Sequence, residues 1–156
     1  MIEKALEACV VDALKAAYED ADVSGVVVRG AWQRVDDGLV KGLEGGEAAD
    51  VFVQVAPRSY DVFGISIVTF NVLVALAVRA EHSPDGALLE ECAAPIAEWL
   101  ESVNAQMDCE NDCGLGAEGF APGGVQLSGG SGPDFDADAG AWRVTWNFSV
   151  RGNINN

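Results

Sequence analysis

The stretch near the C-terminus of the chain alternates apolar and polar residues without exception. Its apolar positions are Trp142, Val144, Trp146, Phe148 and Val150, and its polar positions are Arg143, Thr145, Asn147, Ser149 and Arg151. Because successive side chains of a β-strand point to opposite faces, this pattern predicts a strand with one buried side. A second stretch, residues 65–80, carries apolar residues at every even position from 68 to 78. Together the two stretches predict a sheet with one buried face and one polar face.

The remaining segments complete an α+β chain. Apolar stripes at helical spacing predict a helix over residues 2–19 and another that starts at residues 83–86, with Ser83 as its cap. Shorter strand patterns occupy residues 26–32, 51–55 and 120–127. We expect a mostly antiparallel, four- to five-stranded sheet with two helices packed on one face. The whole chain, residues 1–156, is expected to be one domain, with mobile loops near 36–49, 104–119 and 128–140.

The charge of the chain limits its partners. Twenty-five Asp and Glu oppose nine Lys and Arg, so the net charge is −16. Nucleic-acid binding and anionic membranes both call for basic residues, so we expect neither as a partner. Residues 62–80 are nearly long enough to span a bilayer, but polar residues and a period of two favour a strand. The N-terminal residues lack the apolar core and cleavage site of a secretory signal.

The cysteines offer two alternatives. Cys9 and Cys92 fall at apolar helix positions, where we expect small hydrophobic side chains rather than a disulfide framework. Cys109 and Cys113 could supply two thiolates to zinc or close a loop disulfide. A zinc ion would need two further ligands, which only a subunit interface could add.

Alternating acids at Asp134, Asp136 and Asp138 resemble the opening of a calcium-binding loop. The pattern then fails, because Ala139 replaces the glycine of the sharp turn and Thr145 replaces the bidentate glutamate. An acidic, solvated hairpin loop is the simpler interpretation. The alternative function is a small acidic module that binds a cation.

Catalytic patterns are weak. His82 stands beside Ser83, but adjacent residues rarely form a nucleophile–base pair, and no nucleophile motif surrounds them. The glutamates of the second helix fit a solvated face, and no glycine loop has the form that cradles phosphate. We therefore expect no enzyme activity and no cofactor.

The C-terminal two-thirds resembles the tail terminator and tail-completion proteins of long-tailed bacteriophages. The resemblance rests on the strand ending VALAVRAEHS, the helix PDGALLEECAAPIAEWL, the glycine-containing strand 120–127 and the closing strand WRVTWNFSVRGNI. It implies a structural virion protein that forms a ring, often a hexamer, in the tail or neck of the particle after assembly in the host cytoplasm. Such a ring stops tail-tube polymerisation and binds the tail-tube and head-connector proteins. A related head–tail joining protein is the alternative within this class.

If a ring forms, the arginines are the expected interface residues. We predict this role for Arg79, Arg143 and Arg151, because scarce cations on an acidic chain fit acids on a neighbouring subunit. Trp142 and Trp146 share one face of the last strand and fit either core packing or an aromatic seam between subunits.

Overall fold

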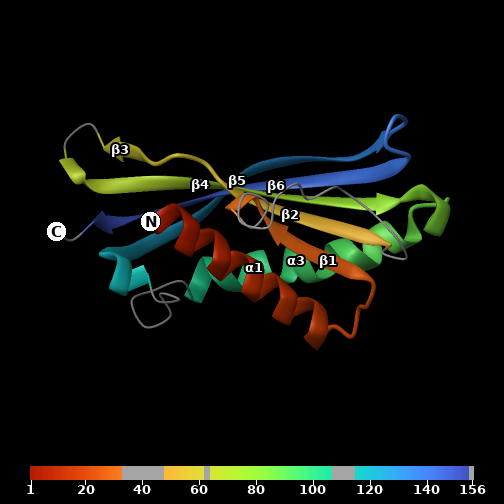
Figure 1. The fold of residues 1–156 in the computed structure, drawn as a ribbon, viewed down its shortest axis with the longest axis horizontal. Helices are drawn as coiled ribbons and strands as arrows, with labels where there is room; N and C mark the ends of the chain where they lie inside the picture. Colours follow the sequence, from red (N-terminus) through yellow and green to blue (C-terminus); the bar gives the residue numbers. More distant parts are fainter. Residues whose placement is uncertain (33–47, 62–63, 107–114, 155–156) are drawn as a thin grey trace.

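The computed structural model describes residues 1–32, 48–61, 64–106 and 115–154. Two long helices and six strands make up most of this part of the chain (Figure 1). In chain order the elements are α1 (Ile2–Asp20), β1 (Val26–Gly30), β2 (Ala49–Val55), β3 (Ser59–Asp61), β4 (Gly64–Arg79), η1 (Ala80–His82), α3 (Ala87–Gln106), η2 (Leu115–Glu118), β5 (Phe120–Asp136) and β6 (Ala141–Ile154). The α+β class predicted from the sequence is confirmed.

The sheet is larger and more mixed than the sequence predicts. Its strand order is β1-β2-β4-β6-β5, and β3 pairs with the far end of β4. β1 and β2 are parallel, whereas all the other pairs are antiparallel. The expected number of four or five strands is therefore too small, because the short strand β3 adds a sixth. β3 is only three residues long, too short to show an alternation of apolar and polar residues. From the sequence alone, this segment, which follows Pro57 and Arg58, reads as a turn.

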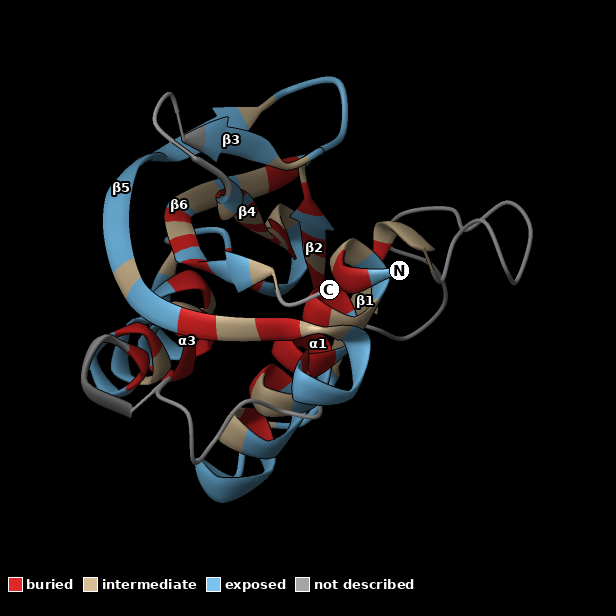
Figure 2. Cartoon of the chain, turned by 90° about the vertical axis from the view of Figure 1, so that its left-hand side faces the viewer, coloured by how far each residue is buried: buried red, intermediate tan, exposed pale blue. Residues whose placement is uncertain are grey.

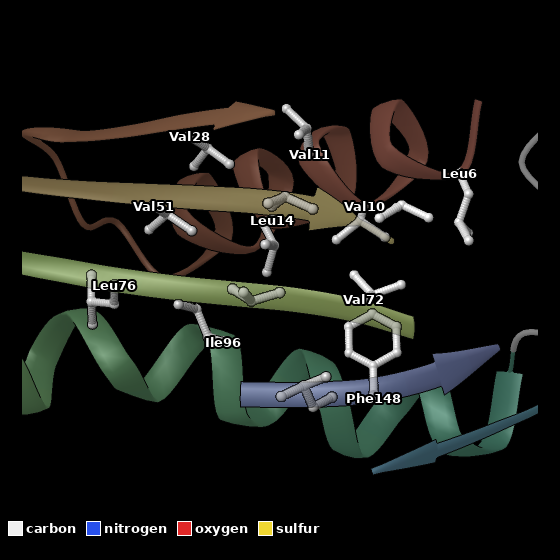
Figure 3. Packing of buried hydrophobic residues seen from close by; sticks show 14 of the residues in the cluster. Leu6, Val10, Val11, Leu14, Val28, Val51, Val72, Leu76, Ile96 and Phe148 are labelled. Atoms are coloured by element: carbon white, nitrogen blue, oxygen red, sulfur yellow. The ribbon is translucent and has the colours of Figure 1, made fainter. Parts of the chain in front are cut away.

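Both helices cover the same face of the sheet, as predicted (Figure 1). Even-numbered residues of β4 point to this face, and the register places Val78 opposite Trp142 and Val72 opposite Phe148. Figure 3 shows Leu6, Val10 and Leu14 of α1 on one side of the core and Ile96 of α3 on the other. Each such side chain removed from water contributes about 1.5–3 kcal/mol. The apolar stripes of the helices and the even positions of the long strands therefore form one core.

β5 corrects a second expectation. Residues 128–140 were predicted to be a mobile loop, yet β5 continues to Asp136 and only the following turn to Gly140 leaves the strand. Register shifts interrupt its pairing with β6 at three places. Each bulge bends a strand. β5 accordingly follows a strongly curved and mostly exposed path (Figure 2).

The other predicted loops lie partly outside the described residues. Residues 36–47 of the predicted loop 36–49 are not among the described residues, and β2 begins at Ala49. Within 104–119, α3 extends to Gln106 and η2 occupies Leu115–Glu118, so these parts are helical. No helix in the described part of the chain is long and apolar enough to cross a membrane. The stretch that approaches bilayer length forms strand β4, as its period of two predicts.

The second helix begins later than predicted. α3 starts at Ala87 after a turn that includes Gly86, whose φ is 80°. Ser83 nevertheless stabilises this end, because the N–H of Leu88 donates to its Oγ at 2.8 Å. The N–H of Ala87 donates to Asp85 Oδ1 at 3.1 Å. Pro84 therefore lies in the turn that leads into the helix rather than in its first turn.

Candidate interaction face

The face of the sheet opposite the helices is open. Odd-numbered residues of β4 and β6 lie on it, and the register adds alternate residues of β1 and β2. Both helices of the described chain lie on the other side (Figure 1). We call this surface the open face. Its residues include Arg29, Asp50, Phe52, Gln54, Thr69, Asn71, Leu73, Ala75, Ala77, Arg79, Arg143, Thr145, Asn147, Ser149 and Arg151.

Basic residues gather on the open face. The chain contains six arginines, and four of them, Arg29, Arg79, Arg143 and Arg151, belong to this face. The structure therefore brings the three arginines predicted from the sequence to one surface and adds Arg29 from β1. Arg58 lies elsewhere, bound to Glu3 of α1. Three acids, Asp50, Asp134 and Asp136, share the face, so on a chain of net charge −16 the described part of this face combines four cations with three anions.

A depression of about 510 Å³ lies at one end of the open face, beside the C-terminal end of β4. Small side chains form its floor, namely Ala75 and Ala77 of β4 and Ala141 of β6. It is also lined by Asp50 and Phe52 of β2, by Thr145 of β6, and by Arg79 and Arg143. Alanine on the central strand leaves the room that a larger residue would fill.

The two arginines beside the depression are held by nearby acids. Arg143 Nε lies 3.2 Å from Asp136 Oδ2, and the Arg143 side chain is 54% exposed. Arg79 Nη1 lies 3.5 Å from Glu81 Oε1, whereas Arg79 Nε is buried and has no hydrogen-bond partner among the described residues. Both guanidinium groups beside the depression are therefore paired with acids of the same chain.

Asp136 also organises the hairpin between β5 and β6. Its Oδ1 accepts hydrogen bonds from the N–H groups of Asp138 and Ala139 at 3.1 and 3.2 Å. The carboxylate thus closes the turn with one oxygen and holds Arg143 with the other. Asp134 lies opposite Arg143 in the register of β5 and β6. The three aspartates proposed for calcium therefore include one whose oxygens already have protein partners.

The structure gives little support to the candidate metal-binding and catalytic residues. Across residues 1–32, 48–61, 64–106 and 115–154, no group of three or more His, Cys, Asp or Glu residues could hold a metal ion. Nε2 of His82, an exposed residue, lies 3.6 Å from Glu81 Oε1. Ser83 is buried, and its hydroxyl accepts the hydrogen bond from Leu88. The serine is thus part of the start of α3 rather than the partner of a base.

The cysteines divide differently from the prediction. Cys9 is disulfide-bonded, which corrects its expected role as a free hydrophobic thiol. Cys92 is a free, buried thiol, as expected, and burial raises its pKa to about 11. Cys109 and Cys113 lie outside the described residues, so the zinc and loop-disulfide predictions stay untested. A disulfide depends on three-dimensional proximity, which the position of Cys9 on an apolar stripe does not reveal.

The two tryptophans of β6 pack against the core. Trp142 and Trp146 are both partly buried beside the core cluster. Trp142 Nε1 donates to the carbonyl oxygen of Ser83 at 3.1 Å, and its ring lies 5.2 Å from that of Phe135. These contacts favour the core-packing interpretation over an aromatic seam.

Glu7 is a buried acid that the sequence pattern did not reveal. It is a charged residue of α1, yet it is only 3% exposed. Its Oε1 accepts a hydrogen bond from the N–H of Trp32 at 2.7 Å, and burial raises the pKa of the carboxyl group. Gly30 provides the space, because a Cβ at that position would collide with the Glu7 side chain. Gly30, at the end of β1, was the one feature of the sequence that could have indicated a side chain packed closely at this point.

Comparison of the chain with known protein-family models and with curated proteins found no match.

Proposed function

We propose that this chain is a structural virion protein that forms a ring and terminates the tail tube of a long-tailed phage. The ring ends tube growth and presents a surface to the head connector. This proposal rests on the resemblance of the C-terminal two-thirds to tail terminator proteins and on the character of the open face. A related head–tail joining protein is the alternative, because it would use the same kind of ring.

The observation that carries the proposal is the collection of four arginines on an uncovered sheet face. Arg79 and Arg143 pair with acids of their own chain, and a subunit that meets an acidic neighbour would gain further complementarity and orientation from the same side chains. The depression beside Arg79 and Arg143 gives this face a shape as well as a charge. These features support an assembling subunit.

The overall charge supports the same role. A ring at the end of a tail tube surrounds the path of the DNA, and a wall of net negative charge repels the phosphate backbone. The chain supplies this charge, at −16 per subunit. Subunits that join through two different faces can close into such a ring.

Light scattering after size exclusion tests the proposal. The mass is measured at low and high protein concentration, with and without a chelator, and larger species are viewed by electron microscopy. A discrete species of about six subunits that ignores the chelator supports the ring. A monomer at every concentration, with no ring on grids, contradicts self-assembly. A species whose size changes when calcium is removed favours the cation-binding module instead.

A further inference from the structure

We propose that the open face binds the outer face of α3 from a second copy of the chain. This inference rests on the proposed ring and names the two surfaces that join its subunits. The outer face of α3 consists of the exposed residues Ala87, Glu90, Glu91, Ala94, Ala97, Glu98, Glu101 and Ser102. The two surfaces fit in charge, in shape and in length.

The charges are complementary. Four glutamates lie on the outer face of α3, and the helix contains no lysine or arginine. Four arginines lie on the open face, where Arg79 and Arg143 also pair with acids of their own chain. The other helix is a poorer match, because Lys4 and Lys15 interrupt the exposed side of α1. Among the described helices, α3 is therefore the better partner for the arginines of the open face.

The shapes are complementary as well. Ala94 and Ala97 lie along the middle of the outer face of α3, with glutamates on either side. The depression on the open face has an alanine floor beside Arg79 and Arg143. Small residues on both surfaces let the helix backbone approach the sheet closely, which places the longer glutamate and arginine side chains beside one another.

The lengths also agree. α3 contains 20 residues, so it is about 30 Å long at 1.5 Å per residue. The odd residues of β4 from Thr69 to Arg79 extend over about 33 Å at 3.3 Å per residue. Most of the length of α3 can therefore lie along this part of β4.

The contact must join two copies. Within one copy, α3 packs on the covered side of the sheet, so its outer face points away from the open face of the same chain (Figure 1). Each subunit then uses its open face for one neighbour and α3 for the other. Such head-to-tail contacts close into a ring or continue as a filament, depending on the rotation between subunits.

Complementary charge reversals test this interface. One variant, R79E/R143E, reverses the open face, and the other, E98K/E101K, reverses the outer face of α3. Each is expected to lose assembly and to run near the subunit mass of 16.3 kDa. Their mixture pairs the unchanged α3 of the first variant with the unchanged open face of the second, and it also pairs the reversed open face with the reversed α3, where the charges attract again. It is expected to recover assembly with the two variants alternating along the ring.

Matched controls carry the same charge changes on α1. K4E/K15E and D12K/E19K should assemble as the wild type does, since these exposed residues belong to neither surface. Circular dichroism and thermal melting check that each variant is folded. Should R79E/R143E fail to fold because Arg79 is partly buried, R143E alone replaces it, since Arg143 is 54% exposed.

The outcomes separate this inference from the proposed function. A wild-type chain that never assembles overturns both. Assembly that survives in either reversal variant overturns the interface and leaves the ring standing. A mixture of the two variants that remains monomeric also overturns the interface.

Discussion

Glu7 is the most buried carboxyl group in the described part of the chain. Its Oε1 accepts a hydrogen bond from the N–H of Trp32, while Oε2 is buried and has no close hydrogen-bond partner among the described residues. An ionised carboxylate in such a place loses its hydration without full compensation. The pKa of Glu7 is therefore raised from its ordinary value of 4.5. The folded state prefers the protonated form of this residue.

This preference predicts a pH dependence that Glu7→Gln removes. Between pH 4.5 and the raised pKa, the folded state holds more protons than the unfolded state, so the free energy of unfolding falls as pH increases. Gln cannot ionise but keeps an oxygen that accepts from Trp32. Relative to Glu7→Gln, the wild type is therefore expected to lose stability as the pH rises above 4.5. Urea denaturation across this range measures the difference, with exposed Glu19→Gln as the control. A difference independent of pH would contradict the prediction.

Gly152 allows β5 and β6 to meet the core at close distance. A Cβ at this position would collide with the carbonyl oxygen of Ala121 and lie 2.7 Å from the ring of Phe120. We expect Gly152→Ala to lower the free energy of unfolding by about 1–3 kcal/mol. Chemical denaturation measures the loss. Gly124→Ala is the control, because no atom lies within 4 Å of its added Cβ. Equal stability of the two variants would show that β5 moves aside at little cost.

At the scale of the elements, Arg58 fastens α1 to the segment between β2 and β3. Its Nε lies 2.8 Å from Glu3 Oε1, and its Nη2 lies 3.0 Å from Oε2. The guanidinium carbon also lies 5.5 Å from the centre of the Phe70 ring. The arginine holds the pKa of Glu3 below its ordinary value. This paired contact connects the first helix to the sheet beside its far end.

Arg58→Lys keeps the charge but loses the two parallel hydrogen bonds. We expect it to cost about 1 kcal/mol at neutral pH. Because the folded pKa of Glu3 is lowered, the pair stabilises the protein above pH 4.5, and this contribution is lost as pH falls through the folded pKa. The cost should therefore shrink in acid, which denaturation at neutral and acidic pH measures. Arg143→Lys is the control at a more exposed ion pair. An equal cost at both pH values would assign the effect to packing.

The elements that could be predicted are those with a strong period. α1, β4 and β6 each repeat their apolar residues over several turns or pleats, and each lies where the sequence indicates. The second half of β5 could not be predicted, because its glycines resemble a loop. A Cβ on Gly130 would collide with the carbonyl oxygen of Thr145, so at least this glycine is required by close pairing with β6. A glycine needed for packing and a glycine needed for flexibility look the same in a sequence.

Only part of the candidate interaction face could be predicted from the sequence, for a similar reason. Alternation along one strand places Arg143 and Arg151 on the same polar side. The addition of Arg29 and Phe52 depends on how β1 and β2 pair with β4, and no single-strand pattern contains that information. The depression likewise depends on alanines from two strands. Sequence therefore indicated the charges of the face but not its breadth or its shape.

At the scale of the whole molecule, the net charge of −16 opposes compact folding. Acids spread over the surface repel one another, and this repulsion is greatest at low ionic strength. Raising the salt concentration from 0.01 M to 0.15 M shortens the screening length from about 30 Å to about 8 Å. Sodium chloride is therefore expected to raise the melting temperature over this range. A melting temperature that stays constant would mean that the surface charges are already balanced locally.

Calcium is expected to raise the melting temperature little beyond the effect of charge screening. Asp136 Oδ1 already accepts hydrogen bonds in the hairpin turn, and Oδ2 already pairs with Arg143. The test is a calcium titration of the melting temperature for the wild type and for two variants of equal charge. D134N/D138N alters the acidic hairpin, whereas D12N/E19Q removes the same charge from exposed positions of α1. We expect all three proteins to respond alike, because nonspecific counterions respond only to total charge. A saturable increase at low calcium that disappears only in D134N/D138N would instead indicate a true site, because a ligand that binds only the folded state stabilises it.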